Sequence, residues 1–238
     1  MVLNLKQVKK KIQKLLGLIS LELTVVACLF IGALFLFALI AHEAVYENED
    51  VFDKRIFAFL SSYSNQGFLE VMKFFTFFGS IQFLLPAYIL LVLYFFIKKK
   101  YRYCIDISII SITSTGLMFG LKELFHRQRP DLPLIKSIAS TYSFPSGHAL
   151  SSFIFCSIVI DLIWESASGR VWKWLFSILL LLFSFTIGIS RIVLKMHYAT
   201  DVIAGFCLGI VWVILSFRVI KKINFKERPF LQNNADIS

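Results

Sequence analysis

The sequence predicts an all-α fold: a polytopic membrane bundle of six transmembrane helices, with an amphipathic helix before the first span and short interfacial helices after it. Of the 238 residues, 58% are hydrophobic and only 17% are charged, and the mean hydropathy is +0.75. Soluble domains carry roughly 25% charged residues. Apolar runs close to the ~20 residues that cross the hydrocarbon recur along nearly the whole chain. The bilayer is therefore the expected solvent of one compact membrane domain.

A lysine-rich amphipathic segment comes first. Residues 1–18 place aliphatic side chains at helical intervals opposite the lysines, which is typical of a helix on an anionic inner leaflet or of a simple topology anchor. The apolar run that follows, 21–41, is too long for a signal-peptide core, and no small-residue cleavage site comes after it. We therefore interpret this run as the first span.

Two aromatic-rich pieces follow, at residues 52–60 and 68–78. The second is too short to cross the membrane, so we expect interfacial helices that pack against the bundle or lie in the outer interface. The remaining spans are expected at residues 81–97, 103–121, 148–164, 171–189 and 200–220. Residues 19–222 would form the six-span domain, and residues 223–238 a cytoplasmic tail that is disordered from Pro229 onward.

The distribution of basic residues predicts the orientation. The net charge is +10, but the lysines and arginines lie between apolar runs rather than on a soluble module, so nucleic acid is not an expected partner. Most of them flank span ends that the positive-inside rule places in the cytoplasm, whereas the connection 42–80 is acidic. Both termini are therefore predicted to be cytoplasmic.

The four cysteines lie inside or at the edge of predicted spans, at Cys28, Cys104, Cys156 and Cys207. Their spacing matches neither a disulfide framework nor a zinc site, and they are best explained as small buried hydrophobic residues. The chain also has no Gly-rich phosphate loop of the Walker type. We predict no metal and no other cofactor.

The predicted outer side carries an unexpected basic cluster. It lies in the second and third outer connections and consists of Lys122, Arg127, Arg129, Lys136, Arg191 and Lys195. Basic residues on this side oppose the usual topological bias, so a functional need for fixed positive charge is the economical explanation.

Three short patterns meet in this cluster. They are Lys122, six residues, Arg129-Pro130; Pro145-Ser146-Gly147-His148; and Ser190-Arg191, five residues, His197, three residues, Asp201. In all their fixed positions they resemble the tripartite motif of the type 2 phosphatidic acid phosphatase superfamily, which includes six-helix lipid phosphatases and is related to vanadium haloperoxidases. The resemblance implies a helical fold and metal-independent hydrolysis of a phosphomonoester or diphosphate through a phosphohistidine.

The residue types support this chemistry. His197 and Asp201 are four apart at the start of the sixth span, so on a helix they would share one face. The carboxylate can accept the proton of one ring nitrogen and leave the other nitrogen free to attack phosphorus. His148 can protonate the leaving oxygen or activate water. We therefore predict His197, Asp201 and His148 as catalytic residues.

A phosphate site is predicted around them. Lys122, Arg129 and Arg191 supply fixed positive charge for the phosphoryl oxygens. Ser146 and Gly147 are expected at a helix N-terminus, where free amides, the helix dipole and the serine hydroxyl face an anion. The neighbouring His126, Arg127, Lys136 and Lys195 are interpreted as headgroup contacts or solvated surface, outside the catalytic set.

The expected function is an integral membrane lipid phosphatase. The resemblance makes undecaprenyl diphosphate, phosphatidylglycerophosphate and phosphatidate the leading substrates, with the site on the outer side of a bacterial inner membrane and membrane lipids as partners. Residues 131–142 would form part of the rim, but no headgroup can be identified from them. A lipid phosphotransferase and a non-catalytic lipid-binding protein stay open as alternatives. The oligomeric state is not predicted.

Overall fold

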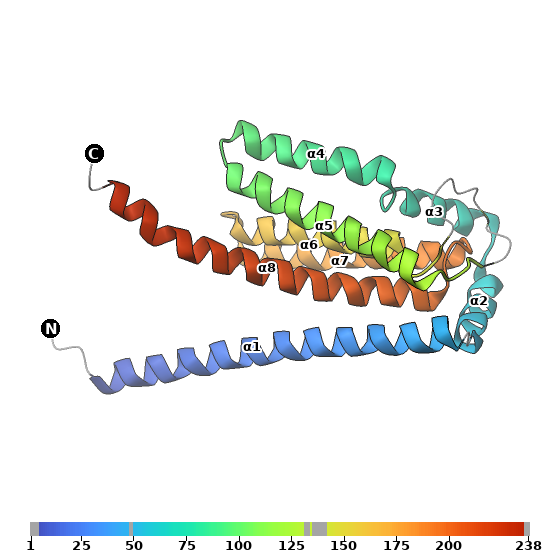
Figure 1. The fold of residues 1–238 in the computed structure, drawn as a ribbon, viewed down its shortest axis with the longest axis horizontal. Helices are drawn as coiled ribbons and strands as arrows, with labels where there is room; N and C mark the ends of the chain where they lie inside the picture. The colour runs from blue at the N-terminus through green and yellow to red at the C-terminus, as the bar shows by residue number, and fades with distance from the viewer. Residues whose placement is uncertain (1–4, 48–49, 131–133, 135–141, 236–238) are drawn as a thin grey trace.

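The computed structural model describes residues 5–47, 50–130, 134 and 142–235. This part of the chain is a bundle of long helices without β-strands (Figure 1). In chain order, the elements are α1 (Leu5–Ala41), the π-helical turn η1 (His42–Tyr46), α2 (Val51–Tyr63), α3 (Gln66–Phe77), α4 (Ile81–Ile97), α5 (Tyr101–Phe125), α6 (Gly147–Glu165), α7 (Arg170–Val193) and α8 (Ala199–Ala235).

The predicted fold class is confirmed. Six stretches of the described helices are long and apolar enough to cross a membrane, and each contains one of the predicted spans. Few of their side chains are buried within the protein, and large apolar residues such as Ile31, Leu90 and Leu182 are exposed. An apolar exterior over the length of the helices is what lipid solvation requires.

Helix α6 lies at the centre of the bundle. It packs mainly against α7 and α8 and also contacts α5. Its buried face contributes Leu150, Ile154 and Ile158 to the main core, where they meet Ile107 and Ile110 of α5. Because α6 is fixed by neighbours on several sides, its first turn is held in a defined position at one end of the bundle.

The two interfacial helices lie at that same end (Figure 1). Figure 1 shows α2 crossing the end of α1, with α3 leading back toward α4. Met72 of α3 is buried against Val193, Leu194 and Met196, which belong to the end of α7 and the turn after it. Packing of this segment against the bundle is therefore observed.

Two chain ends differ from the sequence expectation. The amphipathic N-terminal segment continues without a break into the first span, as one helix, α1, from Leu5 onward. The expectation of disorder from Pro229 is wrong for residues up to Ala235, because α8 continues to that residue. Helix propagation costs little once a long helix is nucleated, which explains how a polar segment extends an apolar one.

Candidate active site

All eight predicted site residues lie at one end of the bundle, near α2 and α3, which we call the site end (Figure 1). They occupy the last turns of α5 and α7, the first turns of α6 and α8, and the segments next to these turns: Lys122, Arg129, Ser146, Gly147, His148, Arg191, His197 and Asp201. The structure therefore brings the three sequence patterns together.

His197 lies in the turn between α7 and α8, and only 2% of it is exposed. Its Nδ1 is 3.4 Å from Oδ2 of Asp201, a long contact of the kind found in catalytic pairs without substrate. The expectation that both residues share a helix face is wrong, because α8 begins only at Ala199. Asp201 instead reaches back from the first turn, where its Oδ2 also accepts the N–H of Tyr198 at 2.9 Å, as in a capping box.

The His197 ring is neutral at physiological pH. Burial lowers the pKa of His197 from 6.5 to about 3; the cations Arg191 and Lys122 act in the same direction, and Asp201 opposes them. With Asp201 as the acceptor at Nδ1, the tautomer assigned to the ring carries its proton there. The lone pair on Nε2 is then available for attack on an electrophile.

The other oxygen of Asp201 accepts a bond from Arg127. Nη1 of Arg127 lies 2.6 Å from Oδ1 of Asp201 and 2.8 Å from Oγ1 of Thr200. The guanidinium also stacks over the ring of Tyr198, 4.2 Å from its centre. The interpretation of Arg127 as a headgroup or surface residue is therefore wrong, because its side chain is buried in this network.

Asp53 of α2 completes the network, and it was not predicted from the sequence. Its Oδ2 accepts bonds from Nη2 of Arg127 at 2.9 Å and from the hydroxyl of Thr200 at 2.6 Å. Its Oδ1 accepts the N–H of Thr200 at 2.9 Å, which satisfies a free amide in the first turn of α8. An interfacial helix is thereby tied directly to the start of the helix that carries Asp201.

The three predicted phosphate-binding cations are partly or wholly buried. Nζ of Lys122 donates to the carbonyls of Tyr142 and Ser143, at 2.7 and 3.4 Å. Nη1 of Arg129 donates to the carbonyl of Met196 at 3.2 Å, and burial lowers the pKa of Arg129 below its ordinary value. Arginine nevertheless stays protonated at neutral pH.

Arg191 is held from α3. Its Nη1 donates to Oγ1 of Thr76 at 2.7 Å, a contact that the sequence patterns did not reveal. Its Nε is buried and has no hydrogen-bond partner among the described residues. A buried guanidinium donor without a partner is costly unless an anion completes it, so Arg191 is suited to bind phosphate.

Ser146 and Gly147 form the predicted helix N-terminus. Ser146 is at the N-cap position of α6, yet its hydroxyl makes no capping bond and is buried without a partner in the described structure. Its backbone N–H donates to the carbonyl of Asp201 at 3.0 Å, which joins α6 to α8. A Cβ on Gly147 would lie 2.5 Å from Sδ of Met118, so a larger residue there would require the flexible end of that side chain to move.

His148 follows on the first turn of α6. Its imidazole interacts electrostatically with His197, Arg191, Arg129 and Lys122. His148 therefore belongs to the same cluster of charged and titratable groups as His197.

The remaining predicted rim is only partly described. Lys136 and most of residues 131–142 lie outside the described residues, whereas Leu134 donates its N–H to the carbonyl of Leu194 at 3.1 Å. His126 is exposed and packs edge-on against Tyr142. Among the described residues, no group of three or more His, Cys, Asp or Glu side chains is arranged to hold a metal ion.

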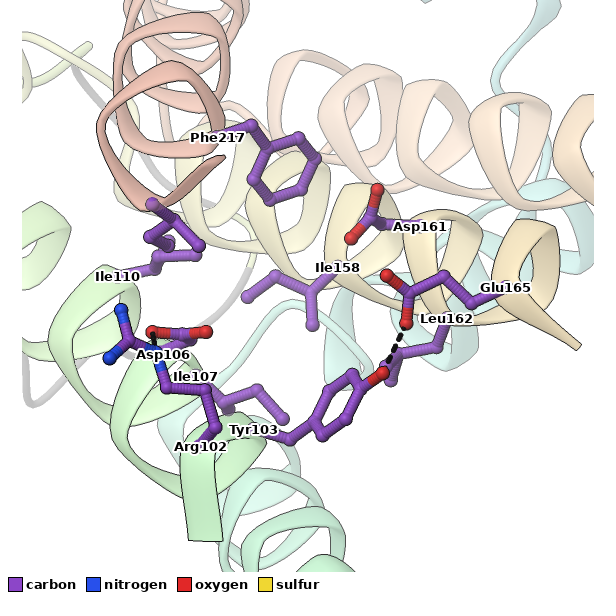
Figure 2. Close-up of a pocket in the computed structure, with 11 residues that line it drawn as sticks. Arg102, Tyr103, Asp106, Ile107, Ile110, Ile158, Asp161, Leu162, Glu165 and Phe217 are labelled. Atoms are coloured by element: carbon purple, nitrogen blue, oxygen red, sulfur yellow. Dashed lines mark hydrogen bonds and ion pairs between the residues drawn. The ribbon is translucent and has the colours of Figure 1, made fainter. Parts of the chain in front are cut away.

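A cavity of about 180 Å³ lies at the opposite end of the bundle, where α5 begins and α6 ends (Figure 2). Its polar lining is mainly acidic, with Asp106, Asp161 and Glu165 beside Arg102. The carboxylate of Glu165 accepts the hydroxyl of Tyr103 at 2.7 Å, as Figure 2 shows. Carboxylates repel phosphate, so this cavity is not the site of the predicted chemistry.

Comparison with known proteins agrees with the geometry at the site end. The family model described as PAP2 superfamily matches residues 103–225, which include all eight predicted site residues. The chain belongs to the PAP2 superfamily. The type 2 phosphatidic acid phosphatase resemblance is thereby confirmed.

Two comparisons with Bacillus subtilis (strain 168) proteins extend this PAP2 assignment over most of the chain. Phosphatidylglycerophosphatase B of that organism is 30% identical over 207 residues, which cover 84% of this chain and 97% of the relative. The crystal structure of a transmembrane PAP2-type phosphatidylglycerolphosphate phosphatase from B. subtilis is also 30% identical, with a TM-score of 0.70 over 83% of this chain and 96% of that one. This PAP2 protein is therefore a multi-pass membrane lipid phosphatase.

A second solved structure shares the fold. Aquifex aeolicus LpxE has a TM-score of 0.51 and 24% identity, over 69% of this chain and 93% of that one. At this identity the likeness concerns the PAP2 helical architecture alone.

Proposed function

We propose that this PAP2 phosphatase hydrolyses a lipid phosphomonoester or diphosphate through a phosphohistidine at His197. The observation that supports this most strongly is the state of His197: a buried, neutral imidazole, with Asp201 on Nδ1 and the charges of Arg191 and Lys122 acting on it. A neutral nitrogen nucleophile among fixed cations is what phosphoryl transfer requires.

In the first step, Nε2 of His197 attacks phosphorus, and a P–N bond forms as the P–O bond to the lipid breaks. The leaving oxygen takes a proton from His148, which enters this step protonated because the bound phosphate dianion stabilises its charge. Negative charge on the equatorial oxygens is stabilised by Lys122, Arg129 and Arg191, and by the unpaired hydroxyl of Ser146 and the amide of Gly147.

In the second step, a water molecule attacks the phosphohistidine. His148, now neutral, accepts a proton from the water as the new P–O bond forms and the P–N bond breaks. The products are inorganic phosphate and the starting imidazole. Asp201 stabilises the positively charged ring that exists between the two steps, without needing to take its proton.

Phosphatidylglycerophosphate is the first substrate to test. The Bacillus subtilis relative and the solved structure at 30% identity are both named for activity on this lipid. Undecaprenyl diphosphate and phosphatidate stay in the comparison, because each presents a terminal phosphate that the same cations would bind. With both termini in the cytoplasm, as the positive-inside rule favours, the site would open to the outer leaflet.

The test is phosphate release by purified protein in detergent from these three lipids, with and without a chelator. We expect His197→Ala to lower kcat at least about 10³-fold, because removing a nucleophile leaves only the binding contribution to catalysis. His42→Ala is the matched control, since His42 is an exposed histidine near the same end of the bundle.

A labelled lipid phosphate should also leave an acid-labile, base-stable phosphoenzyme in the wild type and none in His197→Ala. Undiminished turnover by His197→Ala would refute the phosphohistidine. Loss of wild-type turnover in chelator would contradict metal-independent hydrolysis. Turnover only with an added alcohol acceptor would indicate a phosphotransferase instead.

A further inference from the structure

A buried ionic network connects α2 to the proposed nucleophile. The guanidinium of Arg127 lies between the carboxylates of Asp53 and Asp201, at 2.9 and 2.6 Å. Asp53 is 1% exposed and Asp201 is fully buried. Three buried charged groups are retained at a high desolvation cost, so their arrangement calls for a functional explanation.

The network fixes the orientation of Asp201. Arg127 occupies Oδ1, so that Oδ2 is left for the N–H of Tyr198 and for Nδ1 of His197. A rotation of the carboxylate about its Cβ–Cγ bond would break the bond to Arg127. The guanidinium therefore selects the one orientation in which Asp201 faces His197.

Asp53 in turn fixes both the guanidinium and the start of α8. One of its oxygens accepts from Arg127 and from the hydroxyl of Thr200, and the other accepts the backbone N–H of Thr200. Thr200 directly precedes Asp201, so this contact sets the position of the backbone that carries the catalytic carboxylate. It does so from α2, outside the residues that the family model matches.

The net charge of this network also affects the ring of His197. Two carboxylates and one guanidinium leave a net charge of −1 next to His197. Without Asp53, Arg127 would neutralise Asp201 alone and weaken its attraction for the positively charged phosphorylated ring. Asp53 shares the charge of Arg127 and so preserves the electrostatic effect of Asp201.

We propose that Asp53 and Arg127 are positioning residues for the hydrolysis, which hold Asp201 in register with His197 and keep its negative charge available to the ring. Neither residue touches the reacting atoms. The inference rests on the proposed function, because it takes His197 as the nucleophile.

Asp53→Asn is the sharpest probe. It keeps the size of the side chain and an oxygen for the Thr200 amide, and it leaves Arg127 paired with Asp201, so no buried cation is left alone. Asp50→Asn is the matched control: the same substitution on the partly exposed N-cap residue of α2, whose carboxylate pairs with Lys54 at 2.8 Å and has no hydrogen bond or ion pair to the site among the described residues.

We expect Asp53→Asn to lower kcat roughly 10- to 100-fold, the range seen when outer partners of a catalytic group are removed. KM and the inhibition constant of inorganic phosphate should stay within about threefold, because the three phosphate-binding cations are unchanged. Rapid-quench measurements should show slower phosphoenzyme formation, and Asp50→Asn should match the wild type in every readout.

Thr200→Val is a second variant, in case Asp53→Asn does not fold. It removes the hydroxyl, and with it one bond to Asp53 and one from Arg127, while the backbone N–H to Asp53 remains. We therefore expect a smaller loss of kcat, roughly three- to tenfold, with unchanged phosphate inhibition. The proposal is overturned if kcat of both variants stays within twofold of the wild type, or if kcat and phosphate affinity fall together. Full activity of His197→Ala would refute the nucleophile itself, which separates failure of the proposed function from failure of this inference.

Discussion

At the residue scale, the protonation state of His197 determines what the site can do. A charged imidazole would add a fourth cation to a cluster that already contains Lys122, Arg129 and Arg191. Burial and the charges of Arg191 and Lys122 favour the neutral ring, while Asp201 favours the charged one. The neutral ring is therefore compatible with the nucleophilic role proposed for His197, and a bound phosphate dianion would supply negative charge to the surrounding cations.

This state predicts how stability depends on pH. His197 has a folded pKa of about 3 and an unfolded value of 6.5, so its contribution to stability is complete above pH 6.5 and is lost as pH falls toward 3. Between pH 7 and pH 5, the loss is about 2 kcal/mol, at 1.36 kcal/mol per pH unit below 6.5.

Thermal unfolding in detergent at pH 7 and pH 5 measures this contribution. The wild type should lose more stability on acidification than His197→Gln, which cannot take up the proton. An equal loss in both proteins would mean that His197 is already protonated at pH 5 in the folded state. Other groups that titrate in both proteins contribute equally to the two losses of stability, so their contributions cancel in the difference.

At the element scale, the site depends on how closely α8 approaches the start of α6. Gly205 makes this possible, because a Cβ there would lie 2.7 Å from the carbonyl oxygen of Ser146 and 3.1 Å from Cβ of Ala149. The first contact involves backbone, which cannot rotate away. The same approach allows the amide of Ser146 to reach the carbonyl of Asp201, so packing of the two helices and geometry of the site are coupled.

We therefore expect Gly205→Ala to separate the two helix ends. The overpacking should cost roughly 1–3 kcal/mol of stability, and kcat should fall at least about tenfold because the phosphate site and the nucleophile move apart. Gly120→Ala is the control, since a Cβ at Gly120 of α5 would meet no atom within 4 Å. Thermal unfolding and phosphate release are measured on both; normal activity of Gly205→Ala would show that the close approach is dispensable.

The elements also show where sequence reasoning stops. The spans were predictable because apolar length is set by the bilayer, and the clustering of the eight predicted site residues because their spacing forms recognisable patterns. Asp53 and Thr76 belong to no such pattern, since their partners Arg127 and Arg191 are distant in sequence and meet them only through the packing of α2 and α3. The sequence contained one signal for Asp53. Ile56, Phe57 and Leu60 follow it at helical spacing, three, four and seven residues later, so Asp53 lies on the helix face that packs against the bundle.

At the scale of the whole molecule, the site end and the cavity at the opposite end differ in charge. The site end contains Lys122, Arg129 and Arg191, together with buried polar atoms that have no hydrogen-bond partner among the described residues. The cavity at the opposite end is lined by Asp106, Asp161 and Glu165. A phosphate group is therefore attracted to the site end and not to this acidic cavity. The side of the membrane that this end faces determines which leaflet supplies the substrate.

The charge distribution along the chain predicts that the site end faces outward. Single cysteines introduced at exposed positions test this: Ser62→Cys at the end of α2, near the site, and Lys98→Cys directly after α4, at the opposite end. A membrane-impermeant maleimide should label Ser62→Cys in intact cells, and Lys98→Cys only after the membrane is opened. The unmodified protein is the control, because its own cysteines should react little. Cys156 and Cys207 are buried. Cys28 and Cys104 lie within apolar helices, where the reactive thiolate is disfavoured. The reverse labelling pattern would place the site in the cytoplasm and assign its substrate to the inner leaflet, while leaving the chemistry at His197 unaffected.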